Sequence, residues 1–156
     1  MKYMVAVDGS SSAMHAFWWV LHHATPEDYV YLIHIYKVEG WNGEALLKRL
    51  SRKLKNRNIP RTMLLGEGEA KQKIPKKVEK LGVDMIVMGR RGMNKAKRLY
   101  VGSVSQYVVE HAPCAVCVVK EEVAKPKRTE QAGSRRTLME TQTELGKNHS
   151  NEEPTP

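Results

Sequence analysis

Short apolar runs alternate with amphipathic stretches along residues 1–120, and this alternation restricts the possible folds more than any other feature of the chain. The apolar runs are rich in Val and Ile, as expected for strands covered on both faces. They occupy residues 2–8, 29–36, 60–66, 84–89 and 114–120. Strict alternation of strand and helix with short connections predicts an α/β domain: a five-stranded parallel sheet with right-handed crossovers and helices on both faces.

The four stretches between these runs each carry one apolar stripe at helical spacing. A serine among Ser10, Ser11 and Ser12 is expected to cap the first helix, and Pro75 to lie in the first turn of the third, where its missing N–H costs little. The stripes consist of Ala13, Ala16, Phe17, Val20 and Leu21, then Leu46, Leu47, Leu50 and Leu54, then Ile74, Val78 and Leu81, then Val104, Tyr107 and Val108.

Apolar periodicity stops after residue 120, so we expect one domain over residues 1–120 and a disordered polar tail over residues 121–156. The first part holds twenty Lys/Arg and ten Asp/Glu, a net charge of +10, whereas the tail has a net charge of −1. A basic domain attracts phosphate-rich ligands, although an ordinary solvated basic surface explains the same charge nearly as well.

The chain begins MKYMVAVDGS, which leaves no room for the apolar region of a signal peptide, and no apolar run approaches the length of a membrane span. We therefore expect a cytoplasmic protein without a membrane partner. The two cysteines, Cys114 and Cys117, have C-x-x-C spacing, but strand alternation places residues three apart on opposite faces. Buried structural cysteines are favoured over a redox pair.

Residues 48–57 carry six positive side chains on one expected helix. No aromatic stacking platform or DNA-reading motif accompanies them. We interpret this segment as a solvated helix face, and a nucleic-acid partner is not expected.

Glycines punctuate the segment after the fourth apolar run. Gly89 ends that run, Gly92 follows after two intervening residues, and nine further residues lead to Gly102 and Ser103, where a helix is expected to begin. A phosphate group needs backbone N–H donors at close approach, which glycine permits, and it is attracted to a helix N-terminus. The intervening residues include five cations: Arg90, Arg91, Lys95, Lys97 and Arg98. Turns and close packing use glycine as readily, so the spacing must be read as a whole.

The complete pattern, G-x2-G-x9-G-S, resembles the motif of the ATP-binding subclass of the universal stress protein family. The resemblance covers residues 1–120 and includes VAVDGSSSA at 5–13, LIHIY at 32–36, GVDMIVMG at 82–89 and HAPCAVCVVK at 111–120. It implies a Rossmann-like sheet with strand order 3-2-1-4-5. The chain departs from the family at Arg90, where a small hydroxyl residue is usual, and at Glu69, where proline is common.

The resemblance also implies a nucleotide site. The phosphates would be held by Gly89, Gly92, Gly102 and Ser103, with Val104 and Ser105 continuing the wall. Ribose and adenine would meet Ala6, Val7 and Asp8, with Ile35 and Met88 flanking the base. The Asp8 carboxylate accepts hydrogen bonds from hydroxyls and could also help hold a divalent cation, although it could equally be a turn residue. No metal site is expected from the protein alone, so Mg²⁺ would arrive with ATP.

Three functions are consistent with these features. The first is an ATP-binding stress-response regulator, with ATP, ADP or AMP as the ligand; without a Walker lysine or a general base, at most slow hydrolysis or autophosphorylation at Ser103 or Ser105 is expected. The second is a homodimeric interaction module, joined through the last strand, in which nucleotide is absent or structural. The third, prompted by the run from Ser10 to Ser12, is an adenylating enzyme, but the sequence lacks the S-G-G-x-D-S signature.

Overall fold

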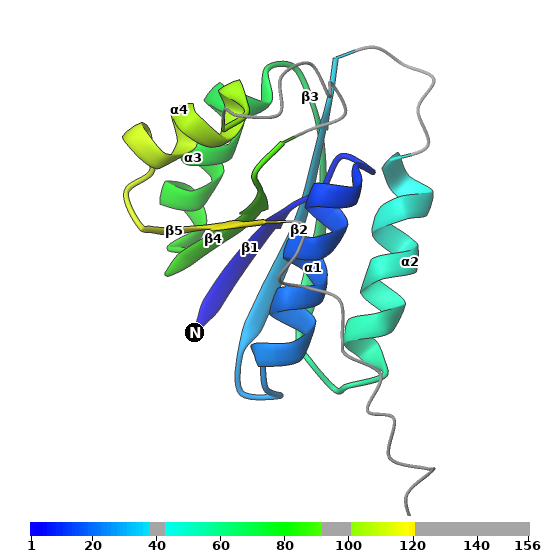
Figure 1. Cartoon of the computed structure of the whole chain (residues 1–156). Coiled ribbons are helices and arrows are strands. Elements are labelled where there is room, and N and C mark those ends of the chain that lie inside the picture. The colour runs from blue at the N-terminus through cyan, green and yellow to red at the C-terminus, as the bar shows by residue number, and fades with distance from the viewer. Residues whose placement is uncertain (38–42, 92–100, 121–156) are drawn as a thin grey trace, which may run out of the picture. The chain divides into compact units, whose positions relative to one another are not determined.

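The computed structural model describes residues 1–37, 43–91 and 101–120, in which strands and helices alternate as the sequence predicts (Figure 1). In chain order the elements are β1 (Lys2–Ala6), α1 (Ser11–His23), β2 (Tyr29–Tyr36), α2 (Gly43–Lys55), β3 (Arg61–Glu67), α3 (Ala70–Leu81), β4 (Met85–Gly89), α4 (Ser103–His111) and β5 (Ala115–Val119). The predicted tail, residues 121–156, lies outside the described residues.

The five strands form one parallel sheet in the order β3-β2-β1-β4-β5, which confirms the predicted Rossmann-like topology. At its carboxyl end β1 pairs with both neighbours, so that Ala6 lies opposite Ile33 of β2 and Met88 of β4. The strand order reverses between β1 and β4. Ligands of open parallel sheets bind beyond the carboxyl ends of the strands at this kind of reversal.

Two hydrophobic cores hold the helices on the two faces of the sheet (Figure 1). Phe17 of α1 and Leu50 of α2 are fully buried in one core, and Ile74 of α3 and Val108 of α4 are buried in the other. The predicted stripes supply most of these side chains, whereas Leu81, Val104 and Tyr107 are half-buried. No helix in the described part of the chain is long and apolar enough to cross a membrane.

The position of Pro75 differs from the prediction. Helix α3 begins at Ala70, one turn earlier than expected, because the Glu69 carbonyl accepts hydrogen bonds from the N–H groups of Gln72 and Lys73. Pro75 therefore lies inside the helix, past the four N-terminal positions whose N–H groups have no helical partner. Because proline has no N–H, Pro75 donates no helical hydrogen bond to the carbonyl four residues before it.

The cysteines occupy opposite faces of the sheet, as predicted, with Cys114 packed against the α3 side and Cys117 against the α1 side. Both are half-buried rather than fully buried, because β5 is the last strand of the sheet. Burial is the main reason why the pKa of each thiol is raised above its usual value.

Candidate functional site

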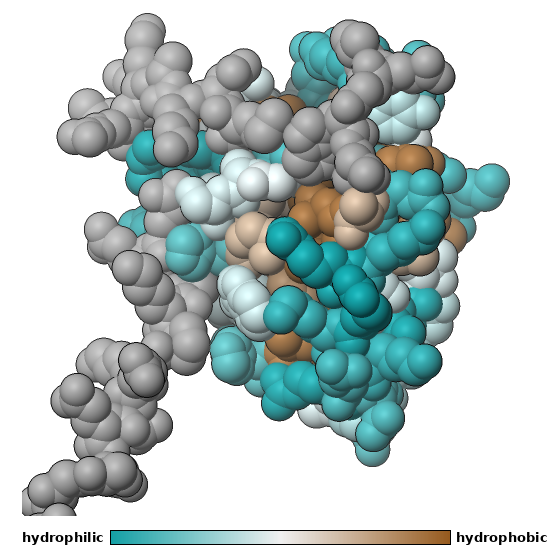
Figure 2. All heavy atoms as spheres, turned by 90° about the vertical axis from the view of Figure 1, so that its right-hand side faces the viewer, coloured by the Kyte–Doolittle hydropathy of each residue, from teal (hydrophilic) through white to brown (hydrophobic). Residues whose placement is uncertain are grey.

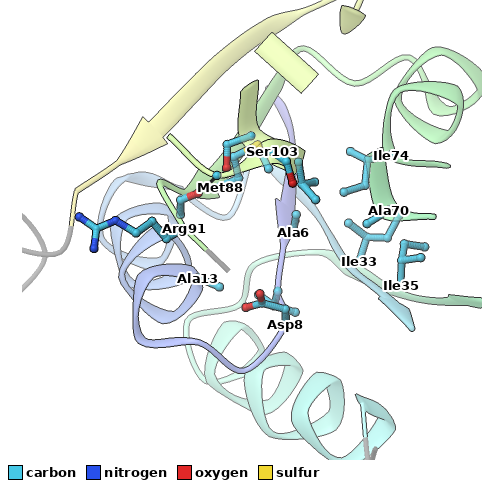
Figure 3. A pocket seen from close by; sticks show the side chains of 15 residues that line it. Ala6, Asp8, Ala13, Ile33, Ile35, Ala70, Ile74, Met88, Arg91 and Ser103 are labelled. Atoms are coloured by element: carbon cyan, nitrogen blue, oxygen red, sulfur yellow. Dashed lines mark hydrogen bonds between the residues drawn. The ribbon is translucent and has the colours of Figure 1, made fainter. Parts of the chain in front are cut away.

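A pocket of about 400 Å³ opens at the carboxyl ends of the central strands (Figure 3). Its volume is within the usual range for small-molecule sites. The predicted residues that line it are Ala6, Val7, Asp8, Ile35, Met88, Gly89, Gly102, Ser103, Val104 and Ser105. The remaining predicted residue, Gly92, lies outside the described residues, as do Lys95, Lys97 and Arg98.

Asp8 lies where β1 leaves the sheet and turns toward α1. One carboxylate oxygen, Oδ1, accepts the Ser10 N–H at 3.0 Å, and Gly9 between them adopts a φ of 83°, which suits a residue without Cβ. The carboxylate is half-buried and lines the pocket. Asp8 therefore combines the two interpretations left open by the sequence, because it stabilises the turn and faces the pocket.

Gly89 brings the end of β4 against the backbone at the start of α1. A Cβ placed on Gly89 would lie 2.4 Å from the Ser12 carbonyl carbon and 2.6 Å from the Ala13 nitrogen, closer than real Cβ atoms approach other heavy atoms. The requirement for glycine here is thus set by packing against a helix, whatever the pocket contains.

Helix α4 begins at the pocket with Ser103, after the N-cap residue Gly102. Ser103 is exposed, whereas Ser105 is buried and its hydroxyl donates to the Gly89 carbonyl at 2.9 Å. The Gly102 N–H donates to the Arg90 carbonyl at 2.7 Å. These two bonds fix the start of α4 against the end of β4, so that the positive end of its dipole is near the pocket.

The start of α1 lies on the same side. Ser10 caps this helix by accepting the Ala13 N–H at 3.2 Å, which confirms one of the three predicted caps. Ser12 is buried and its hydroxyl accepts the Arg91 N–H at 3.2 Å. Two helix N-termini, those of α1 and α4, therefore border one pocket.

The opposite side of the pocket is apolar. Side chains from β2 and α3 gather there, away from Asp8 and Ser103 (Figure 3). They are Ile33, Ile35, Ala70 and Ile74. Sequence reasoning identified only Ile35 of this group as a site residue. The helical stripe already pointed to Ile74, but as a core residue, and it also lines the pocket.

Two other lining residues were missed as site residues. Ala13 belongs to the first turn of α1, and Arg91 follows the end of β4. The Arg91 guanidinium points away from the other labelled residues of the pocket (Figure 3). Its backbone, held by Ser12, forms the wall.

An ion pair lies beside the apolar side of the pocket. Lys37, directly after β2, has its Nζ 2.6 Å from Oε1 of Glu69, which precedes α3. The hydrogen bond from Lys37 lowers the pKa of the Glu69 carboxyl. At this position, where the resemblance implied a proline, the glutamate links the end of β2 to the start of α3.

Comparison with known proteins agrees with this architecture. The sequence profile of the Universal stress protein family matches residues 1–120. A protein of Staphylococcus haemolyticus named as a universal stress protein is 52% identical over 56 residues, which make up 35% of this chain and 34% of the relative. The matched segment thus spans about a third of the length of such curated relatives.

Solved structures share the fold. A universal stress protein of Arabidopsis thaliana, with AMP bound, superposes with a TM-score of 0.65 at 24% identity and covers 82% of this chain and 97% of its own. Another universal stress protein, in complex with cAMP, gives a TM-score of 0.64 at 17% identity, covering 78% of this chain and 97% of its own. On the evidence of the profile match, with the same strand order and helix placement, the chain belongs to the universal stress protein family.

Proposed function

We propose that this protein binds an adenine nucleotide in the pocket at the carboxyl ends of β1, β2 and β4, and acts as a stress-response regulator. The observation that carries the proposal is the division of one pocket into an apolar side and a polar side bordered by two helix N-termini. An adenine base fits the first, and phosphate groups fit the second.

The roles of the lining residues follow from their positions. Ile35 and Met88 would contact the base, together with Ile33 and Ile74. Asp8 would accept hydrogen bonds from the ribose hydroxyls through the oxygen that does not hold the Ser10 N–H. The phosphates would lie against Gly89 and Gly102, where no Cβ hinders close approach, and would be bound by Ser103 at the start of α4, with Val104 and Ser105 behind it. Gly92 is proposed on the sequence motif alone.

The ligand is proposed to be ATP, as the glycine motif implies, with ADP or AMP as the alternatives. The bound AMP and cAMP of two structural relatives support the adenine base rather than a particular phosphate chain. Any Mg²⁺ would come with the phosphates. Hydrolysis is expected to be slow, and we propose a cytoplasmic regulator rather than an enzyme with rapid turnover.

The first test is the small-molecule content of the purified full-length chain after denaturation, followed by calorimetric titration of the emptied protein with ATP, ADP and AMP. GTP is the matched control, because it carries the same phosphates on a different base. A stoichiometric adenine nucleotide, or saturable binding that prefers ATP to GTP, supports the proposal. Absence of saturable binding at millimolar nucleotide contradicts it.

A second candidate function is a homodimeric interaction module. It is favoured by β5, which lies at one edge of the sheet and keeps Val116, Cys117 and Val118 only half-buried. Unpaired backbone groups at such an edge can pair with a second copy. Sedimentation equilibrium of the full chain tests this: a monomer at all concentrations removes the candidate, whereas a dimer that forms without nucleotide favours it.

A further inference from the structure

Positive charge is unevenly distributed over the two helical layers of the fold. Between Glu44 and Glu67 the chain contains seven Lys/Arg and no Asp/Glu, and this span comprises most of α2, the turn after it and most of β3. Helix α1, which packs beside α2, contains no charged Asp, Glu, Lys or Arg at all. The layer of α1 and α2, with the turn that follows α2, therefore carries a dense positive charge with Glu44 as its single carboxylate.

The other layer has a different balance. Helix α3 holds five lysines, but Glu69 precedes it, Glu79 lies within it, and Glu110 lies on the neighbouring helix α4. Five cations therefore accompany three carboxylates in this layer, whereas α2 and the turn after it hold six cations and one carboxylate. The asymmetry is a property of the folded domain and is not visible in the net charge of +9.

Several of the cations on the α2 side are held by uncharged partners. Lys53 Nζ lies 4.8 Å from the centre of the Trp18 ring. Arg57 donates to the Leu21 carbonyl, and Arg61 Nε donates to the Ser51 hydroxyl at 2.9 Å. These contacts order the side chains and leave their charge uncompensated, which favours attraction of an external anion.

Three exposed cations follow one another along α2. Arg49, Arg52 and Lys55 are exposed, and no carboxylate of the described residues lies within ion-pairing distance of them. They are three residues apart, so that a rise of about 1.5 Å per residue separates successive charges by about 4.5 Å along the axis.

We propose that the exposed face of α2, with Arg49, Arg52 and Lys55, together with Arg57 in the turn after it, binds the phosphate backbone of a nucleic-acid duplex without reading its sequence. The absence of a base-reading motif and of an aromatic stacking platform from the cationic segment was the reason to expect no nucleic-acid partner. Backbone binding requires neither, so the proposal departs from that expectation for binding that does not depend on sequence. Lys53 covers the Trp18 ring, so the face offers charge rather than an aromatic surface.

The surface composition favours a duplex over other polyanions. The face on the side of α2 is mostly hydrophilic (Figure 2), and α2 exposes no large apolar side chain that could enter a membrane. An acidic peptide would need an apolar anchor, and the exposed candidates, Met63 and Leu65, lie on β3 rather than between the cations. A row of cations without apolar side chains between them therefore fits a phosphate backbone better than it fits a membrane or an acidic peptide.

The test uses full-length protein, a fluorescent DNA duplex of about 20 base pairs and about 150 mM salt, where weak surface attraction is screened. One variant combines Arg49→Gln, Arg52→Gln and Lys55→Gln. Its matched control combines Lys76→Gln, Lys77→Gln and Lys80→Gln, which removes the same three charges from exposed positions of α3. Circular dichroism establishes that both variants are folded before binding is measured.

Micromolar binding by the unmodified protein is expected, with a loss of about tenfold or more in the α2 variant and less than about twofold in the α3 variant. The slope of log K against log salt should also fall by about 2 to 3 in the α2 variant alone, because three phosphate contacts are removed. Equal losses in the two variants, or no saturable binding of the duplex, would overturn the proposal. Equally tight binding to polyglutamate or to vesicles of phosphatidylserine would overturn it too.

Discussion

The imidazole Nδ1 of His34 lies 2.7 Å from the carbonyl oxygen of Val7, and only 4% of the histidine is exposed. A carbonyl can only accept, so Nδ1 carries the proton and donates it. The Val7 N–H donates to the Ile33 carbonyl at 2.9 Å and so continues the hydrogen bonds between β1 and β2. The His34 imidazole donates to the carbonyl of Val7 itself, at the point where the chain leaves the sheet. Since the next residue is Asp8, the imidazole fixes the direction from which that carboxylate enters the pocket.

Replacing His34 should therefore weaken nucleotide binding without removing any group that contacts the nucleotide. We expect His34→Leu to lower ATP affinity about tenfold, a change of about 1.4 kcal/mol, because the Val7 carbonyl loses its donor. His34→Asn keeps an N–H donor at a similar position and should retain most of the affinity. Calorimetric titration of both folded variants measures this.

The same experiment separates a local from a general effect. If His34 acts through Asp8, the losses caused by His34→Leu and Asp8→Asn should not add in the double variant. Additive losses, or equal affinities for His34→Leu and the unmodified protein, would show that the imidazole does not position the carboxylate.

Gly89→Ala is expected to destabilise the fold. The added Cβ would meet the backbone of Ser12 and Ala13, which cannot move aside as a flexible side chain can, so a loss of about 1–3 kcal/mol in the free energy of unfolding is expected. Urea unfolding measures it. The control is Gly102→Ala, another glycine of the same motif: Gly102 has an ordinary φ of −62°, and its replacement should cost about 1 kcal/mol or less. Equal costs would contradict this account.

The two serines at the start of α4 should respond differently to removal of their hydroxyls. Ser105→Ala leaves the buried Gly89 carbonyl without the hydroxyl donor, and we expect the free energy of unfolding to fall by about 1–3 kcal/mol. Ser103→Ala affects an exposed side chain and should leave stability within about 0.5 kcal/mol of the original while weakening ATP binding. Thermal unfolding with and without ATP distinguishes the two; a Ser105→Ala protein of unchanged stability would be the contrary result.

The half-buried thiols should make the fold less stable in alkali. Burial raises the pKa of Cys114 and of Cys117, so below the usual thiol pKa of about 8.5 both folded and unfolded chains hold these protons. Above it the unfolded chain loses them first, and stability falls as pH rises through the raised values. Urea unfolding of the unmodified protein and of the double variant Cys114→Ala/Cys117→Ala, each at about pH 7 and about pH 9.5, measures this effect. The double variant should lose less stability between the two pH values. An identical loss in both proteins would count against it.

The sequence predicted the sheet well because its signals are local and repeated. The run from Tyr29 to Tyr36 is predicted with the bounds of β2, since only His34 interrupts its apolar residues and Asp28 and Lys37 flank it. The start of α3 was harder to predict. Pro75 suggested a first turn, but the preceding residues form helix because the Glu69 carbonyl accepts two N–H groups there.

The pocket was predicted on its polar side and largely missed on its apolar side. Asp8 stands out because it directly follows the first strand, and the glycines because they have the complete G-x2-G-x9-G-S spacing. Ile33, Ala70 and Ile74 look like ordinary core residues, because only the packing of α3 on β2 decides whether an apolar side chain faces a core or a cavity. The hydrogen bond from the Ser105 hydroxyl to the Gly89 carbonyl could not be predicted from the sequence, because it joins residues sixteen positions apart.

The bond between the Gly102 N–H and the Arg90 carbonyl, at 2.7 Å, joins the two ends of an eleven-residue connection. The Arg90 N–H also donates to the Val119 carbonyl, so the same point is attached to β5. Because the fold holds the two ends of the connection together, closing it costs conformational entropy. This cost grows only slowly with the number of residues between the ends. For protein engineering, the paired backbone of Arg90 and Gly102 thus offers a fixed attachment point, at which a segment could be inserted without redesign of the sheet.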